Sequence, residues 1–183
     1  MLSNDKEYNN IKIHTQYSIC EGAIKIDDLA DFCKKNKIKS VGLADSYNLC
    51  GALEFAEKIS KVGTQPIIGT QINLLSNNLM GKITLYATSK KGYQNLTKLS
   101  SLSYLKNKDS NDHYCEVSDL ISNNEDLILL TGNYNDFFGK LFNANKEKNL
   151  ENIIKELKSC FQDRLYVEIQ RHNEKFEVNY ENY

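Results

Sequence analysis

Short apolar runs rich in β-branched residues alternate along this chain with helical segments, and this alternation limits the possible folds more than any other feature. The predicted strands span residues 11–14, 40–44, 66–74, 82–87, 126–130 and 164–169. The predicted helices span residues 26–33, 53–59, 90–105 and 150–161, and residues 76–81 between two strands are expected to turn. Strands that alternate with helices imply right-handed crossovers and a parallel sheet, so the sequence predicts an α/β fold.

The same alternation is compatible with a βα barrel or with an open sheet, and we favour the barrel. No apolar run follows residue 169 that would supply a last strand, although the tail from residue 172 begins as a further helix would. The barrel is therefore expected to be incomplete on its C-terminal side. The chain has neither an internal repeat nor a domain linker. Residues 1–183 are interpreted as the N-terminal and central part of a single domain within a longer chain.

Charge and cysteine content narrow the possible functions and the compartment. A formal net charge of −1 argues against a free-standing nucleic-acid-binding domain, which usually carries a basic excess to neutralise phosphates. Five scattered cysteines without a CxxC pair fit neither a disulfide framework nor a zinc ribbon, and they indicate a reducing compartment. Since no segment reaches membrane-spanning length, we expect a cytoplasmic protein without membrane contact.

Polar residues follow several predicted strands at the point where each strand ends. His14, Asp45, Gln71 and Asn133 all occupy such positions. In parallel βα folds the carboxyl ends of the strands meet at one rim, where functional groups gather. These side chains are therefore expected to lie close together. On the helix after Gly51, an apolar stripe of Leu53, Ala56 and Ile59 is expected to face the core.

Five motifs, in order along the chain, resemble the alpha subunit of bacterial DNA polymerase III. They are HTQYS with EGA at residues 14–23, VGLAD with NLCG at 41–51, PIIG at 66–69, LYATSKKGYQNLTKLS at 85–100 and EIQRH at 168–172. The fourth is the most specific, because it is similar to the family pattern LLAKNxxGYxNLxKLxS along its whole length. The order and spacing of the motifs match the family from about residue 10 to residue 172, which is nearly the whole chain.

This resemblance implies a PHP domain, a distorted (βα)7 barrel. In active relatives a cluster of His, Asp, Glu and Cys ligands holds metal ions that activate water against a phosphoester. In some alpha subunits the result is a metal-dependent 3′–5′ exonuclease. The resemblance therefore directs attention to the ligand positions of this chain.

The ligand pattern is broken here. Compared with the family motif, only His14 and Glu21 keep a ligand residue type. The replaced positions fall at Lys12, Ser46, Gln71, Lys82 and Asn133, and a final Asp-x-His pair would lie past Tyr183. A Lys ammonium cannot coordinate a metal, and Ser, Gln and Asn are poor ligands for zinc-like ions. We therefore predict no intact metal site, no catalytic residue and no cofactor for this chain.

The two lysines are expected to take over the space of the former metal ions. Emptying such a centre leaves carboxylates without the cations that balanced them, which is unfavourable in a partly buried site. Lys12 and Lys82 would each pair with Glu21 or with a carboxylate from beyond residue 183.

Structural roles are favoured for the remaining polar residues. Asp45 is expected to accept backbone N–H bonds in the turn after its strand. Glu168 and His172 are expected to be solvated at the rim, and His113, in a polar loop, is expected on the surface.

The resemblance implies that the parent protein performs template-directed DNA synthesis, with magnesium held by carboxylates outside this chain. This region would then be a structural domain on which the proofreading exonuclease subunit docks, beside other replicase subunits, with DNA bound by the parent. The alternative is a stand-alone metal-dependent PHP phosphoesterase of the histidinol-phosphatase kind. That alternative requires the ligands that are replaced here. A third reading is a metal-free PHP protein that serves only as a docking module, and the polymerase reading contains it.

Overall fold

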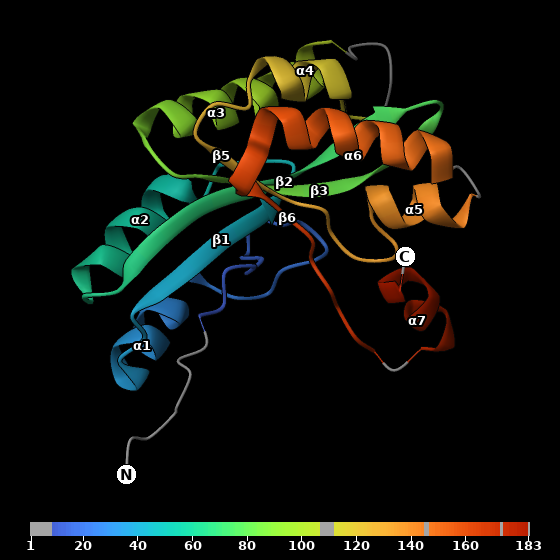
Figure 1. Cartoon of the computed structure of the whole chain (residues 1–183). Helices are drawn as coiled ribbons and strands as arrows, with labels where there is room; N and C mark the ends of the chain where they lie inside the picture. Colours follow the sequence, from blue (N-terminus) through green and yellow to red (C-terminus); the bar gives the residue numbers. More distant parts are fainter. Residues whose placement is uncertain (1–8, 107–111, 145–146, 173, 183) are drawn as a thin grey trace.

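The computed structural model describes residues 9–106, 112–144, 147–172 and 174–182 (Figure 1). Its strands are β1 (Ser40–Ser46), β2 (Gln65–Ser76), β3 (Leu79–Ala87), β4 (Cys115–Glu116), β5 (Leu127–Leu130) and β6 (Leu165–Tyr166). Its helices are α1 (Ile26–Asn36), α2 (Ala52–Lys61), α3 (Lys90–Leu105), α4 (Val117–Ser122), α5 (Phe137–Asn143), α6 (Glu147–Phe161) and α7 (Lys175–Asn182), with a 3-10 turn at Gln162–Arg164. None of the described helices is long and apolar enough to cross a membrane.

One mixed sheet organises the described chain. The strands lie in the order β1-β2-β3-β5-β6, and β4 pairs with β2 beside this path. The pairs β1–β2, β2–β4 and β5–β6 are parallel. An isolated bridge between Ile13 and Leu43 adds the first apolar run beside β1, also in parallel. The α/β fold predicted from the sequence is thus confirmed, and the sheet does not close on itself.

Strand β3 departs from the parallel order, because it runs antiparallel to both β2 and β5. Only Asn77 and Asn78 separate β2 from β3, and both have positive φ angles, of 49° and 59°. Two central residues with positive φ form the tight turn that favours a hairpin, and Asn accepts this conformation better than most residues. A two-residue connection leaves no room for the crossover that a parallel pair needs. The predicted turn is therefore present, and it dictates the direction of β3.

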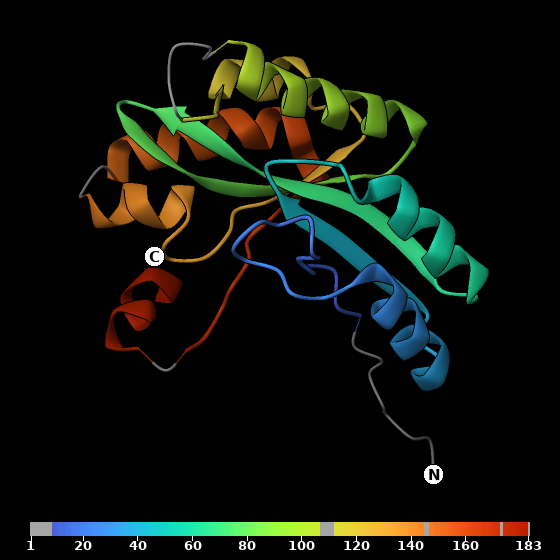
Figure 2. The same ribbon diagram turned by 180° about the vertical axis from the view of Figure 1, so that it is seen from behind.

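The two faces of the sheet are covered differently. Helices α3, α4 and α6 lie over one face, while the N-terminal loop and the segment after β6 lie toward the other (Figures 1 and 2). Alternate residues of β2 and β3 such as Ile72, Leu74 and Leu85 are wholly buried in the large core beneath the helices. The opposite, concave face carries the small apolar cluster of Ala44, Tyr86 and Leu130. Polar side chains on this face, at Ser46, Gln71, Lys82 and Thr84, form the candidate site.

The predicted core stripe of α2 is partly wrong. Ile59 is wholly buried, but Leu53 is 71% exposed, and the helix buries Ala52 and Phe55 instead. Positions 52, 55 and 59 form a stripe with the same helical spacing, one residue away from the predicted one. The large Phe55 side chain decides which stripe faces the sheet, because burying it removes more apolar surface from water than burying Leu53 would.

Residues between the long elements contain structure that the sequence patterns do not reveal. The predicted loop at 106–115 lies partly outside the described residues, and its end, Cys115–Glu116, forms β4. Helices α4 and α5 are too short for a clear period and were not predicted. The tail does form a helix, α7, as expected.

Gly42 provides a test of how the first apolar run packs on β1. A Cβ atom at this position would lie 2.1 Å from the carbonyl oxygen of Ile11, which is backbone and cannot move aside. Gly42→Ala should therefore destabilise the protein by about 3 kcal/mol in urea unfolding, the upper range for overpacking. Gly63→Ala is the matched control. The added Cβ atom would have no atom within 4 Å, and the positive φ of Gly63 is the sole source of strain. This variant should lose about 1 kcal/mol. Equal losses for the two variants would contradict this packing.

Candidate functional site

The register of the sheet places polar side chains in one row on the concave face. Ser46 at the end of β1 pairs with Gln71 of β2, and Gln71 pairs with Thr84 of β3. Paired residues in neighbouring strands point to the same face, so these three side chains are neighbours. The Gln71 Nε2 group donates to the Thr84 hydroxyl at 3.2 Å, and Lys82 lies two residues before Thr84 on the same face.

The first of two ion-pair networks joins β3 to the N-terminal loop. The Lys82 ammonium donates to the Glu21 carboxylate, which also accepts a bond from the Ser46 hydroxyl. Lys82 Nζ lies 3.3 Å from Ser46 Oγ, and 5.1 Å from the centre of the Tyr47 ring. One ammonium thus contacts a carboxylate, a hydroxyl and an aromatic face. The sequence resemblance places metal ligands at the positions of Lys82, Glu21 and Ser46.

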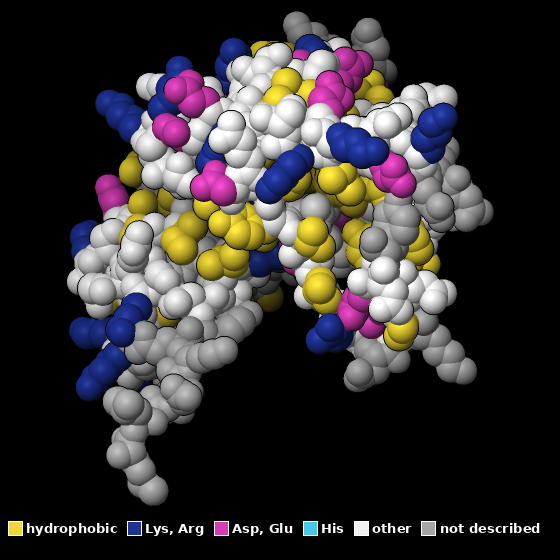
Figure 3. Space-filling view, viewed as in Figure 1, with side chains coloured by type: hydrophobic (Ala, Val, Ile, Leu, Met, Phe, Trp, Pro, Cys, Tyr) yellow, Lys and Arg dark blue, Asp and Glu magenta, His cyan; other side chains and the backbone are white. Residues whose placement is uncertain are grey.

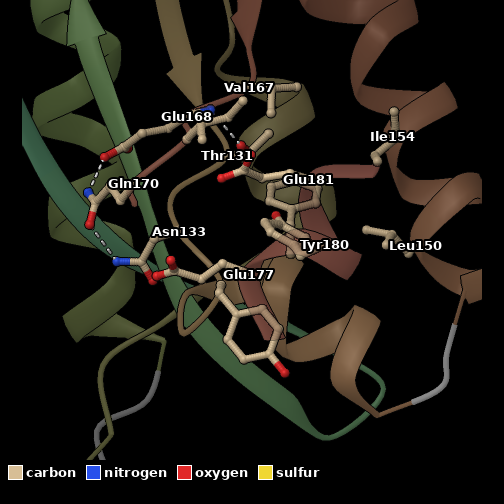
Figure 4. Close-up of a pocket in the computed structure, with 13 residues that line it drawn as sticks. Thr131, Asn133, Leu150, Ile154, Val167, Glu168, Gln170, Glu177, Tyr180 and Glu181 are labelled. Atoms are coloured by element: carbon tan, nitrogen blue, oxygen red, sulfur yellow. Dashed lines mark hydrogen bonds between the residues drawn. The ribbon is translucent and has the colours of Figure 1, made fainter. Parts of the chain in front are cut away.

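The second network joins the N-terminal segment, where the predicted strand at 11–14 is reduced to the bridge at Ile13, to the segment after β6. Lys12 Nζ donates to both carboxylate oxygens of Glu168, at 2.8 Å and 3.0 Å. Gln170 donates to Glu168, and Asn133 donates to Gln170 at 3.0 Å (Figure 4). The Lys12 and Glu168 side chains are only 17% and 14% exposed, so this pair is largely withdrawn from water.

The partner predicted for Lys12 was wrong. The sequence suggested Glu21 or a residue past 183, and it placed Glu168 at a solvated rim. In the structure β6 runs parallel beside β5, so the segment after Tyr166 passes close to the N-terminal segment. Glu168 therefore turns toward Lys12. The only signal in the sequence was the alternation of side chains along a strand. Glu168 stands two residues after Tyr166, so an extended segment would place both side chains on the same face. The pairing of Lys82 with Glu21, by contrast, is as expected.

His14 lies between the two networks. Its Nδ1 is 3.4 Å from the Ser18 hydroxyl. Burial lowers the pKa of His14 below its usual 6.5, and the charges of Lys82 and Lys12 lower it further, while Glu21 acts in the opposite direction. The structure therefore brings together the two retained positions, Glu21 and His14, with both lysines.

Asp45 has a different role, because its side chain points to the other side of β1 from Ser46. It is completely buried and accepts bonds from the Thr15 N–H at 2.6 Å, the Thr15 hydroxyl at 2.7 Å and the Ser18 hydroxyl at 2.7 Å. It thus fixes the N-terminal loop, rather than its own turn as predicted. The loop so held carries His14 and Glu21.

The other two histidines lie outside this cluster. His113 is half-buried and stacks on Tyr104 with ring centres 4.0 Å apart, so its expected surface position is corrected. The aromatic partner was not visible in the sequence, since Tyr104 belongs to α3 and stands nine residues before His113. The His172 side chain is exposed and meets Glu177 at the start of α7, at 3.1 Å.

The donor set of the concave face does not fit the zinc-like ions that the resemblance implies. Two ammonium groups occupy the cluster and satisfy the carboxylates Glu21 and Glu168. Among the described residues, no group of three or more His, Cys, Asp or Glu is placed to hold a metal ion. Chemically, the arrangement is a pair of bridges that tie the N-terminal segment to β3 and to the segment after β6.

Removing Lys12 should show how much the ion pair between Lys12 and Glu168 contributes to the stability of the fold. Lys12→Met leaves Glu168 without its cation, and we expect a loss of about 1–3 kcal/mol in urea unfolding. Lys91→Met is the control, since Lys91 and Glu125 are 3.9 Å apart and both well exposed. It should change stability by less than about 0.5 kcal/mol. The double variant Lys12→Met, Glu168→Leu should recover part of the loss, because no buried charge is then unpaired. A Lys12→Met variant as stable as the parent would mean that the lysine is a solvated bystander.

The bridge between Lys82 and Glu21 should be sensitive to acid. Partial burial disfavours the charged carboxylate, but the hydrogen bonds from Lys82 and Ser46 prevail and hold the pKa of Glu21 below its usual 4.5. A carboxyl group whose pKa is lower in the folded chain stabilises the fold at pH values above its pKa in the unfolded chain. This stabilisation is lost as the pH falls through the pKa in the folded chain. Lys82→Met should therefore be less stable than the parent at about pH 7, and the difference should shrink at about pH 3. Urea unfolding at both pH values measures this. A difference that is constant with pH would contradict the bridge.

Comparisons with known proteins agree with the motifs. The family model described as the PHP domain matches residues 10–172. The DNA polymerase III subunit alpha of Caulobacter vibrioides is 33% identical over 171 residues, and that of Rickettsia felis is 34% identical over 168 residues. These matches cover 89% and 91% of this chain but only 15% and 14% of the relatives. The solved structure of an amidohydrolase from Chromobacterium violaceum shares 14% identity, with a TM-score of 0.40 over 51% of this chain and 34% of that one, a likeness too slight to bear on chemistry.

The family match therefore extends over nearly the whole chain, whereas the chain spans only about one seventh of the length of these relatives. Its matched residues include the N-terminal loop, β1, β2 and β3, which together carry most of the candidate site. The chain belongs to the PHP domain family, and the curated relatives it matches are alpha subunits of DNA polymerase III.

Proposed function

We propose that this chain is the PHP region of a DNA polymerase III alpha subunit, and that it acts there as a structural domain without metal-dependent hydrolysis. The parent would perform template-directed nucleotidyl transfer in DNA replication. Two kinds of support exist: the relatives are alpha subunits matched over about nine tenths of this chain, and the five motifs of that family stand in order in its sequence. Magnesium and the incoming nucleotide would be held by carboxylates elsewhere in the parent, and no residue of this chain is assigned to them.

One observation carries the structural role, namely the occupation of former ligand positions by paired lysines. Lys82 with Glu21 and Lys12 with Glu168 satisfy one another within the space that a metal centre would need. A metal ion entering this cluster would meet two positive charges at short range and would have to displace both from their carboxylates. In a partly buried site such repulsion is expensive, so a divalent ion should be excluded.

The bridges also explain why a domain without metal would keep this geometry. Metal ions connect strands by binding ligands from several of them at once. Here the lysines do the same, since one bridge reaches from β3 to the N-terminal loop and the other from the N-terminal segment at Lys12 to the segment after β6. The cluster thus replaces coordination bonds with charge-assisted hydrogen bonds.

We further propose that this region seats the proofreading exonuclease subunit of the same replicase. Its own site lacks the ligands for hydrolysis of phosphoesters, so proofreading would require a separate subunit held near the polymerase. The net charge of −1 favours a protein partner over direct binding of DNA by this region. A stand-alone phosphoesterase of the histidinol-phosphatase kind is the less favoured function, because it needs metal ligands where Lys12, Lys82 and Gln71 stand.

Metal analysis tests the absence of hydrolytic function. Protein purified without metal and then reconstituted with zinc or manganese should retain neither ion stoichiometrically, and it should not hydrolyse a phosphomonoester or the 3′ end of a DNA strand. Lys12→His should not change this, because Ser46, Gln71, Lys82 and Asn133 remain unaltered. Stoichiometric metal together with turnover in the parent protein would overturn the proposal.

Co-purification tests the docking role. The full-length alpha subunit that contains this region should form a stable complex with the exonuclease subunit of its own organism, detected by size exclusion and calorimetry. The complex should survive Lys91→Met and weaken when the domain is destabilised by Gly42→Ala. If the full-length subunit binds no exonuclease subunit, this part of the proposal is wrong, while the metal result stands independently.

A further inference from the structure

Lysines gather at the end of the molecule where α1 and α2 terminate. Residues 32–39 and 58–65 contain six lysines and neither aspartate nor glutamate. Since the whole chain has a formal net charge of −1, the rest of it is acidic, and positive charge is concentrated in these two segments. Figure 3 shows Lys and Arg side chains gathered at the lower left, where Figure 1 places α1 and the end of α2.

Backbone bonds hold the two lysine-rich segments together. The Gln65 N–H donates to the Lys39 carbonyl at 2.8 Å, and the Thr64 hydroxyl donates to the Ile38 carbonyl at 2.8 Å. These bonds continue into the parallel pairing of β1 with β2. The lysines therefore stand at the amino ends of two paired strands, whereas β6, after which the sheet is open, lies at the opposite edge.

Five of these lysines form what we call the lysine patch: Lys34, Lys35, Lys37, Lys39 and Lys61. All five are exposed. Four of them form no ion pair with any residue that the structure describes, namely Lys34, Lys35, Lys37 and Lys61. The sixth lysine is left out of the patch, because two carboxylates already pair with it. Like charges that share one surface repel one another, so the patch attracts an anionic partner.

The helix dipoles explain only part of this charge. Lys34 and Lys35 stand in the last turn of α1 and Lys61 in the last turn of α2, where a cation compensates the negative end of the helix. Lys37 caps α1 with a φ of 52°, a left-handed conformation that favours Gly or Asn. Lys39 follows two residues later, where the dipole has fallen off. The last two lysines thus add charge that the helix ends do not require.

The residue types of the patch fit a phosphate backbone better than a protein surface. Lysine is depleted in interfaces between proteins, and ordering its flexible side chain costs conformational entropy. Contacts with nucleic-acid phosphates instead gain free energy from the counterions that they release. Phe32 lies one turn before the end of α1 and is 57% exposed, and an exposed aromatic ring beside cations is a surface on which an unpaired base stacks.

We propose that the lysine patch binds the phosphate backbone of DNA, as a contact without sequence preference that adds to a main DNA site elsewhere in the parent. The net charge of −1 disfavours DNA binding by this region alone, but a local patch contributes once the DNA is held nearby. The acidic remainder of the chain repels the backbone and so confines the contact to this end. The inference rests on the proposed function, in which the parent is a DNA polymerase, and adds a surface of this chain that touches DNA.

The salt dependence of DNA binding tests the patch. Fluorescence anisotropy measures binding of a fluorescein-labelled primer–template by the full-length alpha subunit, at salt concentrations from about 50 to 200 mM. Each phosphate contact contributes about 0.9 to the steepness of log K against log salt concentration. The combined variant Lys34→Gln, Lys35→Gln, Lys37→Gln, Lys61→Gln should reduce this steepness by about 2 to 3.5, and should weaken binding at least about tenfold at the lowest salt.

Two controls separate the charge of the patch from other effects. Arginine at the same four positions keeps the charge and should keep the parent steepness. Lys90→Gln with Lys98→Gln removes two exposed charges from α3 and should leave the steepness unchanged, whereas Lys35→Gln with Lys37→Gln should reduce it. Parent-like steepness in the fourfold glutamine variant, or an equal reduction in the α3 control, would overturn the assignment.

Primer extension distinguishes failure of this inference from failure of the proposed function. At low salt and saturating DNA the fourfold glutamine variant should extend a primer at the parent rate, because no patch residue is assigned to catalysis. If the parent itself extends no primer, the proposed function fails. If both proteins extend the primer and their salt dependences agree, this inference alone fails.

Two further outcomes would assign the patch to another class of partner. One is a fourfold glutamine variant that keeps the salt dependence of DNA binding but loses the complex with the exonuclease subunit, which would make the patch a protein interface. The other is a variant that keeps this salt dependence but loses binding to vesicles of phosphatidylserine and phosphatidylcholine, which would make it a membrane contact. Either result contradicts the proposed contact with DNA.

Discussion

The buried carboxylate of Asp45 is the interaction on which the arrangement of the site depends. It sits at the end of β1 without contact to water, and three short hydrogen bonds from Thr15 and Ser18 hold the N-terminal loop against it. A buried carboxylate needs such donors, because an unpaired one would be strongly unfavourable. The loop that is fixed in this way carries His14 and Glu21 to the concave face. Asp45 thus fixes the loop that carries Glu21, the partner of Lys82 in the first ion-pair network.

The ion pairs of the concave face connect segments that lie far apart in the sequence. Lys82 of β3 reaches Glu21 of the N-terminal loop, and Lys12 reaches Glu168 after β6. Their long, flexible stems let the ammonium groups reach the space between strands, which a shorter side chain could not do. The two lysines thereby tie the N-terminal segment to β3 and to the segment after β6.

The two bridges differ in burial, and this difference predicts different consequences. Lys12 and Glu168 are shielded together, so breaking that pair leaves a charge in a poorly solvated place. Lys82 and Glu21 lie nearer the surface, where water screens the interaction and part of the attraction is lost.

The sequence by itself determined the α/β class, most of the strands and the positions where ligand types are missing. Those features depend on local periodicity and on residue identity, so the strand predicted at 40–44 matches β1 (Ser40–Ser46), and the predicted turn precedes Leu79. Only the tertiary structure decided which charges pair. Lys12 and Glu168 are 156 residues apart, and no local pattern brings them together; the parallel pairing of β5 with β6 does so. The choice of Phe55 over Leu53 as a core residue was likewise made by packing, since both positions fit a helical stripe and burying the larger side chain removes more apolar surface from water. Side-chain partners across the sheet depend on register and direction, and these follow from the assembled fold rather than from any single segment.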